Sequence, residues 1–326
     1  MKLSLIACLL LFVQPVFAQN FGAQEPFHLI NIGNGAAALG MGGAYVAVAE
    51  DLSALAWNPA GLSHQTGLRL QFDSLYTTGS EEFEVHTNQT GTTLQDYSVH
   101  GFQPQSLALT YQMTRGNFIF GPAFGWGRSG LYLDTYEMKD PINGPFTSPI
   151  FFAEGTYTYE SGRTYHRSGE DIYSFGFSLR LPNRVSIGGV WNLVGGELTQ
   201  DLFIQNSQQG TQIFFPPDEE PVFGSFSSHR SFVQTTTEKI SGNYVNVGIL
   251  YEYHPKFSFG GAIRFGYTRK REITEFSKVD FDFTGMVTSS YHLESEFGPI
   301  TIESELPIEF SGGVAIRLTP RIRVAS

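Results

Sequence analysis

DIYSFGFSLRLPNRVSIGGVWNL, residues 171–193, is the stretch of sequence that decides the fold. Large apolar side chains stand at nearly every second position before and after Pro182-Asn183, with serine, glycine, asparagine or arginine between them. Successive residues of a β-strand point to opposite faces, so this alternation predicts strands. Proline and asparagine suit a tight turn. We therefore expect an antiparallel hairpin with one large apolar face and one small or polar face.

The same alternation recurs along the chain, and short turns and long polar stretches take turns in joining the segments. Alternating segments lie at 118–126, 245–253, 257–267 and 308–318, and the other short turns lie at 114–117, 255–256 and 320–321. The polar stretches lie at 127–170, 195–243 and 269–306 and are expected to be loops or extensions of the strands. Short turns at one end and long loops at the other are typical of outer-membrane barrels.

Strand length distinguishes such a barrel from a soluble β-sandwich, which also alternates. Sandwich strands usually have about 5–6 residues, whereas a tilted membrane strand needs about 9–11, the length that these segments reach. We predict an all-β fold, a transmembrane antiparallel β-barrel. Its large apolar face is expected to contact lipid, and its Gly, Ser, Arg and Glu face is expected to line the lumen.

The N-terminus predicts export. MKLSLIACLLLFVQPVFA has a positive start at Lys2, an apolar run and a small residue at Ala18, as in a signal peptide. Cys8 gives a lipoprotein as the alternative, but the apolar run continues beyond it. After Ala18 no apolar run approaches the roughly 20 residues of a membrane-spanning helix, so strands must do any spanning. We expect a multi-pass barrel of the bacterial outer membrane.

Composition and motifs argue against several other functions. The formal charge is -11, and the basic residues are scattered, which argues against binding to nucleic acid. The histidines show no HExxH spacing, and no serine lies in GxSxG. We expect no enzyme activity, no catalytic residues, no cofactor and no metal site.

Residues 19–66 differ from everything after them. They contain ALGMGGAYVAVAED (residues 38–51) and then Asn58-Pro59-Ala60, and they are rich in glycine and alanine. Such small side chains allow close backbone approach and do not suit a lipid-facing strand. A nucleotide loop is the alternative, but no GxGxxG or Walker lysine pattern is present. The segment is expected to be compact packing material.

At these residues the chain resembles the FadL/OmpP1/TodX family of outer-membrane transporters for hydrophobic compounds. The resemblance implies a 14-stranded barrel plugged by an N-terminal hatch, and passive uptake of long-chain fatty acids or other hydrophobic compounds. By position, it places seven residues in hatch and gating roles: Gly40, Gly42, Gly43, Asp51, Asn58, Pro59 and Ala60. Barrels resembling PorV, which serve type IX secretion and bind protein partners, are the alternative.

The expected organisation is a signal peptide at 1–18, a hatch at 19–66 and a barrel at 67–326. The count of alternating segments gives eight strands and the start of a ninth, and the chain ends at Val324-Ala325-Ser326 without the usual terminal aromatic residue. An unclosed edge in lipid is costly. The sequence is therefore expected to be a C-terminally incomplete barrel.

Two further features suggest transport. Gly121-Pro122 interrupts a strand, and this pair resembles the family's inward kink for lateral release; a simple bulge for curvature is the alternative. Arg180, Arg264 and Arg317 have lumen parity and are expected either to meet a fatty-acid carboxylate or to pair with Glu252, Glu309 and Asp51. The expected partners are a hydrophobic small molecule such as a fatty acid, outer-membrane lipid and lipopolysaccharide, and, under the alternative, secreted proteins.

Overall fold

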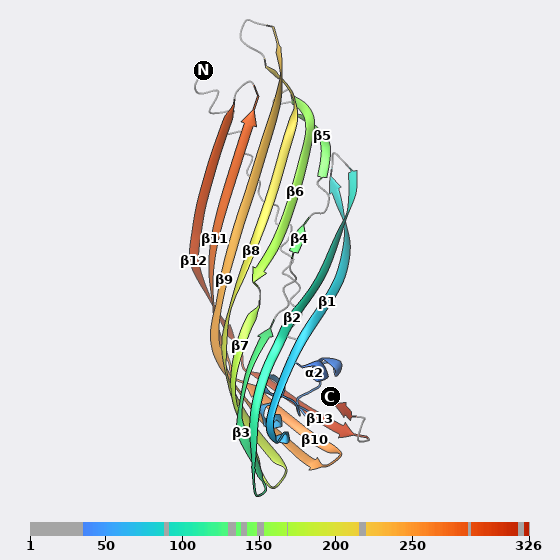
Figure 1. Ribbon diagram of the computed structural model, residues 1–326, viewed down its shortest axis with the longest axis vertical. Coiled ribbons are helices and arrows are strands. Elements are labelled where there is room, and N and C mark those ends of the chain that lie inside the picture. Colours follow the sequence, from blue (N-terminus) through green and yellow to red (C-terminus); the bar gives the residue numbers. More distant parts are fainter. Residues whose placement is uncertain are drawn as a thin grey trace.

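The computed structural model describes residues 35–87, 91–129, 135–137, 142–148, 153–167, 169–214, 220–285, 288–318 and 323–325. The expected signal peptide and the first part of the expected hatch lie outside these ranges. Figure 1 shows a long sheet that curls at one end around the N-terminal segment, which is drawn in blue.

The described strands form one antiparallel sheet, so the all-β prediction is confirmed. The main path follows the order of the sequence and has the shape of a curled half-barrel. It runs through β1 (Gly67–Thr87), β2 (Gly91–Arg115), β3 (Phe118–Ser129), β7 (Glu170–Arg180), β8 (Val185–Phe214), β9 (Val222–His254), β10 (Phe257–Arg264), β13 (Glu309–Arg317) and β14 (Arg323–Ala325).

The long polar stretches are strands over nearly all of their described residues. They contain β4 (Thr135–Glu137), β5 (Ile142–Ser148), β6 (Ala153–Arg167), β11 (Tyr267–Thr284), β12 (Ser289–Leu306) and the distal parts of β8 and β9. Beyond the end of β7, residues 199–212 of β8 pair with β6. Beyond the end of β10, residues 227–241 of β9 pair with β11. The backbone of these polar residues is therefore satisfied by ladder hydrogen bonds, which lengthen the sheet far beyond the curled part (Figure 1).

Tight turns close the other end of the sheet. In the turn between β7 and β8, the Leu181 amide donates to the Val185 carbonyl at 2.8 Å, and the Arg184 amide donates to the Leu181 carbonyl at 3.2 Å. Arg184 has a φ of 64°, in the left-handed region that non-glycine residues seldom adopt. The turn expected at Pro182-Asn183 is thus present and extends to Arg184.

The two faces of the curled part differ as the alternation predicts. On the convex face large apolar side chains are exposed: Phe177 is 53% exposed, whereas its neighbour Ser178, on the concave face, is 0% exposed. Ser174, Asn192 and Asn246 are likewise buried on the concave side. The exposed apolar side chains of this face include Phe124, Tyr173, Phe175, Ile187, Trp191, Val245, Ile249, Phe259, Phe310 and Val314.

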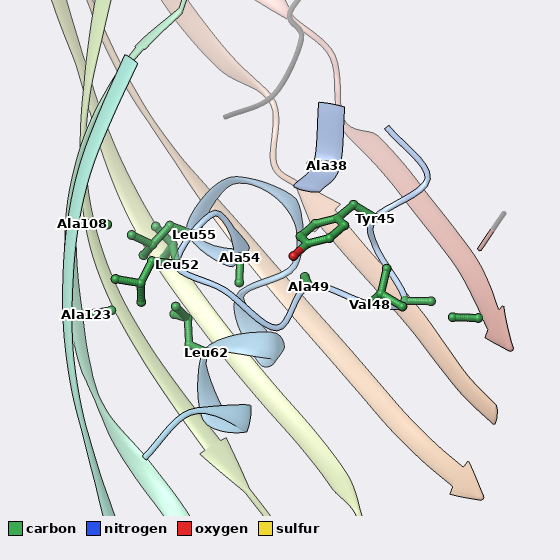
Figure 2. Packing of buried hydrophobic residues seen from close by; sticks show 13 residues of the cluster. Ala38, Tyr45, Val48, Ala49, Leu52, Ala54, Leu55, Leu62, Ala108 and Ala123 are labelled. Atoms are coloured by element: carbon green, nitrogen blue, oxygen red, sulfur yellow. The ribbon is translucent and has the colours of Figure 1, made fainter. Parts of the chain in front are cut away.

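Residues 35–66 contain three short helices: α2 (Ala36–Gly40), α3 (Ala54–Trp57) and the 3-10 helix η1 (Pro59–His64). Within the described ranges, no helix has the length and apolar character that crossing a membrane requires. Leu52, Leu55 and Leu62 point toward Ala108 and Ala123 on the sheet (Figure 2). The main apolar core therefore lies between this segment and the concave face.

Candidate functional site on the concave face

Residues 35–66, here called the N-terminal segment, fill the curled part of the sheet. Helix η1 contacts β3, β7, β8 and β9. Its Leu62 is fully buried, as is Val190 of β8, in the same apolar cluster. The segment thus covers the small and polar face of four neighbouring strands.

Asn58 fixes the segment to the sheet. It is 0% exposed, and its Nδ2 donates to the Val46 carbonyl at 2.8 Å and to the Ile249 carbonyl of β9 at 3.0 Å. Its Oδ1 accepts from the Ala60 amide at 3.2 Å and so caps η1, which starts with Pro59. Asparagine before proline suits this helix start, because the side chain caps the free amide and proline needs no amide partner. One side chain therefore joins two parts of the segment to the wall.

Glycines of the wall form the seat on which the segment rests. A Cβ at Gly188 would lie 2.4 Å from the Pro59 carbonyl, and one at Gly248 would lie 2.0 Å from Asn58 Oδ1. A Cβ at Gly260 would lie 2.2 Å from the Val46 carbonyl oxygen. No real Cβ contacts are that short, so only glycine allows the backbones to approach. The sequence placed glycine on the face that lines the lumen but did not identify these close contacts; the recurrence of glycine on one face was the available signal.

Polar contacts also hold the segment to β1, β9 and β10. Ser258 of β10 donates to the Ala47 carbonyl at 2.8 Å, and the Leu52 amide donates to Gln71 Oε1 of β1 at 2.9 Å. His64 Nε2 lies 3.5 Å from Glu252 Oε1 of β9. The segment is thus anchored on both sides of the curled sheet.

The glycines expected in the hatch lie around the first helix. Gly40 ends α2 and is exposed, and Gly42 and Gly43 have φ values of 62° and 86°. A Cβ at Gly43 would lie 3.3 Å from the Trp57 ring. Gly42 and Gly43 therefore allow the chain to turn back after α2 and pass close to α3.

Asp51 stays within the segment. Its Oδ1 accepts from the Ser53 amide at 3.0 Å and also from the Ser53 hydroxyl. Burial, followed by the nearby Asp51 carboxylate, raises the pKa of Tyr45 above its ordinary value. Tyr45 therefore stays a neutral donor beside Asp51, and this polar pair lies inside the turn between α2 and α3.

Each of the three luminal arginines forms an ion pair. Arg180 pairs with Glu252, and Arg264 Nη1 lies 3.0 Å from Glu309 Oε2. Arg317 Nη2 lies 3.3 Å from Glu50 Oε1, so the acidic partner from the N-terminal segment is Glu50, and the expected Asp51 is wrong. The reason is local, because the Asp51 carboxylate is held by Ser53. The structure gives three separate ion pairs on different strands and does not bring these arginines together.

Gly121-Pro122 interrupts the ladder between β2 and β3. Thr110 pairs with Ala123 and Met113 with Phe120, with no backbone pairing recorded between them and no register shift, so the feature is not a bulge. The Thr110 hydroxyl donates to the Pro122 carbonyl at 2.9 Å, and Gln112 Nε2 donates to the Gly121 carbonyl at 3.2 Å. Side-chain hydrogen bonds from β2 therefore satisfy two carbonyls of β3 where the backbone pairing is interrupted, and they hold the two strands together there.

Comparisons with known proteins place the chain only distantly. No family model matches, and no curated protein matches. Among solved structures, the toluene transporter TodX of P. putida is similar at 10% identity and a TM-score of 0.32, over 90% of this chain and 91% of that one. The toluene transporter TbuX of Ralstonia pickettii is similar at 13% identity and a TM-score of 0.21, over 82% of this chain and 99% of that one. Both are distant structural neighbours.

Proposed function

We propose that this protein is a β-barrel transporter of the bacterial outer membrane and that it carries hydrophobic compounds, such as long-chain fatty acids, passively past its N-terminal segment. The segment acts as a hatch, with 1–18 as signal peptide, 19–66 as hatch and 67–326 as barrel. Surrounding lipid and lipopolysaccharide contact the outside of the barrel.

The observation that carries the proposal is the reversal of an ordinary protein's polarity around the curled sheet. Large apolar side chains are exposed on the convex face, and buried serine, asparagine and glycine lie on the concave face. β7 has 11 residues and β13 has 9, which matches the about 9–11 residues of a tilted membrane strand. A surface of this kind is stable in lipid and unfavourable in water.

The anchors of the segment suggest how the hatch works. Asn58, Pro59 and Ala60 are buried against β8 and β9, and the buried Ala47 is held to β10 through the Ser258 hydroxyl. Gly40, Gly42 and Gly43 lie where the chain turns back after α2, and Asp51 accepts a hydrogen bond from the Ser53 amide just before α3. Transport requires the part of the segment around Ala47 to move away from the sheet, since the segment occupies the concave face.

The exit and the substrate follow from the same geometry. Gly121-Pro122 is the proposed lateral exit, because side-chain hydrogen bonds replace the ladder there and can break without unpairing the strands on either side. Arg180, Arg264 and Arg317 are proposed luminal contacts of the substrate, but each already has an acidic partner. A fatty-acid carboxylate would have to displace that partner. No described feature specifically favours the secretion-related alternative.

The proposal is tested by tying the hatch to the wall. Ala47→Cys with Ser258→Cys places two thiols where a serine now donates to a carbonyl at 2.8 Å, and a bifunctional thiol reagent can bridge them. Uptake of a hydrophobic probe such as octylbenzene is expected to fall severalfold on cross-linking, because the part of the segment around position 47 can no longer leave β10. The mature chain has no other cysteine if cleavage follows Ala18.

A wall-to-wall cross-link is the matched control. Phe259→Cys with Val314→Cys bridges residues directly opposite each other on β10 and β13 and leaves the segment free, because both side chains are exposed on the convex face. Uptake that survives both cross-links contradicts a moving hatch. If cells with the unmodified protein take up the probe no faster than cells without it, the transport function itself is wrong.

A further inference from the structure

Three polar side chains lie on the concave face of the neighbouring strands β8, β9 and β10. Asn192 lies opposite Tyr244, and Asn246 lies opposite both Val190 and Arg264. Asn246 is therefore a direct neighbour of Arg264, with Cβ atoms about 4.5–5.5 Å apart, and a diagonal neighbour of Asn192 at about 7–8 Å, so it lies between the other two. Asn192 and Asn246 are 2% and 4% exposed.

Each of these side chains has a buried polar atom with no hydrogen-bond partner in the described part of the chain. These atoms are Asn192 Nδ2, Asn246 Oδ1 and the Arg264 Nε. The other amide atom of Asn192, Oδ1, is satisfied by the Ser174 hydroxyl at 2.7 Å. A buried donor or acceptor without a partner is costly, so three such atoms on adjoining strands would gain from a polar group bound between them. The site offers two donors and one acceptor.

The charge of the site is already balanced. Arg264 pairs with Glu309 at 3.0 Å, and its guanidinium lies 5.3 Å from the centre of the Tyr244 ring. A carboxylate entering here would bring a second negative charge beside Glu309 and would have no unpaired cation to meet. A neutral hydroxyl avoids this cost and, unlike a carboxylate, can also donate to Asn246 Oδ1.

Apolar and aromatic groups surround these polar atoms. The rings of Tyr244 and Tyr267 stack with their centres 4.8 Å apart. Val190, opposite Asn246, belongs to the apolar cluster that also contains Leu55 and Leu62 of the N-terminal segment. A ligand at this position is therefore flanked by the Tyr244–Tyr267 pair and by the apolar cluster of the hatch.

We infer that Asn192, Asn246 and Arg264 form a binding site for the hydroxyl group of a hydrophobic compound, most favourably a phenol whose ring packs against Tyr244. This inference rests on the proposed transport function and narrows its substrate class from fatty acids toward uncharged, hydroxyl-bearing molecules. The hydroxyl oxygen accepts from Asn192 Nδ2 and Arg264 Nε, and the hydroxyl hydrogen is donated to Asn246 Oδ1.

The test compares three probes with the same apolar body: 4-octylphenol, 4-octylbenzoate and octylbenzene. At pH 7 the phenol is neutral and the benzoate is charged, by analogy with tyrosine and with protein carboxyl groups. Equilibrium binding to the full chain in lipid nanodiscs is measured, and empty nanodiscs give the background. The phenol is expected to bind about tenfold more tightly than octylbenzene, which corresponds to about 1.4 kcal/mol, and also more tightly than the benzoate.

Substitutions assign the preference to the site. Asn192→Leu and Asn246→Leu are expected to bring phenol binding down to the level of octylbenzene and to leave octylbenzene binding unchanged. Asn243→Leu is the matched control, because Asn243 lies on β9, as Asn246 does, but has an exposed side chain. Unaltered phenol preference in either site variant, or preference for the benzoate in the unmodified protein, overturns the inference.

The same probes distinguish the two levels of the proposal. Octylbenzene uptake by cells without any preference for the phenol leaves transport standing and overturns the hydroxyl site alone. If none of the three compounds is bound or taken up, the transport function and the hydroxyl site are both wrong.

Discussion

The two ends of the β8–β9 hairpin share one ladder but follow different rules. Backbone pairing runs without a register shift from Val185 and Tyr251 to Phe214 and Val222. In the curled part, Trp191 and Ile249 are exposed on the convex face and the opposite face packs on the N-terminal segment. In the distal part, most positions of the same parity hold polar side chains, as where Thr235 donates to Asp201 at 2.6 Å. The distal part is thus stabilised mainly by its backbone hydrogen bonds. The stability of the curled part also depends on the apolar convex face and on packing against the N-terminal segment.

A charge on each convex surface tests this difference most strongly. Phe177→Arg puts a cation on the proposed lipid face and is expected to destabilise the barrel in vesicles by about 2–4 kcal/mol. Ser207→Arg places the same side chain on the distal part, where serine already faces His229, and should change stability little. The midpoint of urea unfolding in lipid vesicles measures both. Equal effects of the two substitutions would contradict a membrane boundary between them.

The seat of the segment gives the next largest expected effect. Gly248→Ala adds a Cβ 2.0 Å from Asn58 Oδ1 and should cost about 1–3 kcal/mol through overpacking. Gly195→Ala on β8 is the control, since nothing lies within 4 Å of the added atom. Protease cleavage of the segment, followed over time, reports its release. Slow cleavage in both variants would mean that Asn58 is not held against β9 in solution.

The smallest effect is expected at the distal end and depends on pH. Hydrogen bonds to Asp280 and then to Glu294 raise the pKa of His292, which lies opposite Asp280 in the β11–β12 pair. The charged histidine therefore stabilises this pair below the ordinary histidine pKa of 6.5, and the contribution is lost as the pH rises through the higher folded-state value.

Hydrogen exchange at the amides of β11 and β12, corrected for intrinsic rates, measures this effect. Protection at pH 6 is expected to exceed protection at pH 8.5, and His292→Gln should remove the difference. The curled part serves as the internal reference. A pH dependence that persists in His292→Gln would assign it to another group.

The sequence predicted the features that depend on neighbours along the chain. Alternation around Pro182-Asn183 predicted the hairpin and the facing of its side chains, because the period of a strand is local. The glycine and alanine content of 38–51 predicted a compact segment, and part of it packs in the core. These properties follow from the order of residues, without knowledge of which distant strands meet.

Features that need distant contacts were missed or mistaken. Gly248 and Asn58 are far apart in sequence, so no local pattern shows that one makes room for the other. Arg317 selects Glu50 over Asp51 because of a hydrogen bond to Ser53 that only the folded segment reveals. The distal strands were left open between loop and strand, because polar residues give weak β signals and their order comes from pairing with β8 and β9.

The length of β9 has a consequence for how far the sheet extends from the membrane. At about 3.4 Å per residue its 33 residues extend about 110 Å. Even at a tilt of about 45° such a strand rises about 80 Å along the membrane normal, nearly twice the about 40–45 Å of a bilayer with its headgroups. With the curled part in the membrane, as proposed, the distal sheet stands clear of the lipid as a tall surface on one side of the membrane.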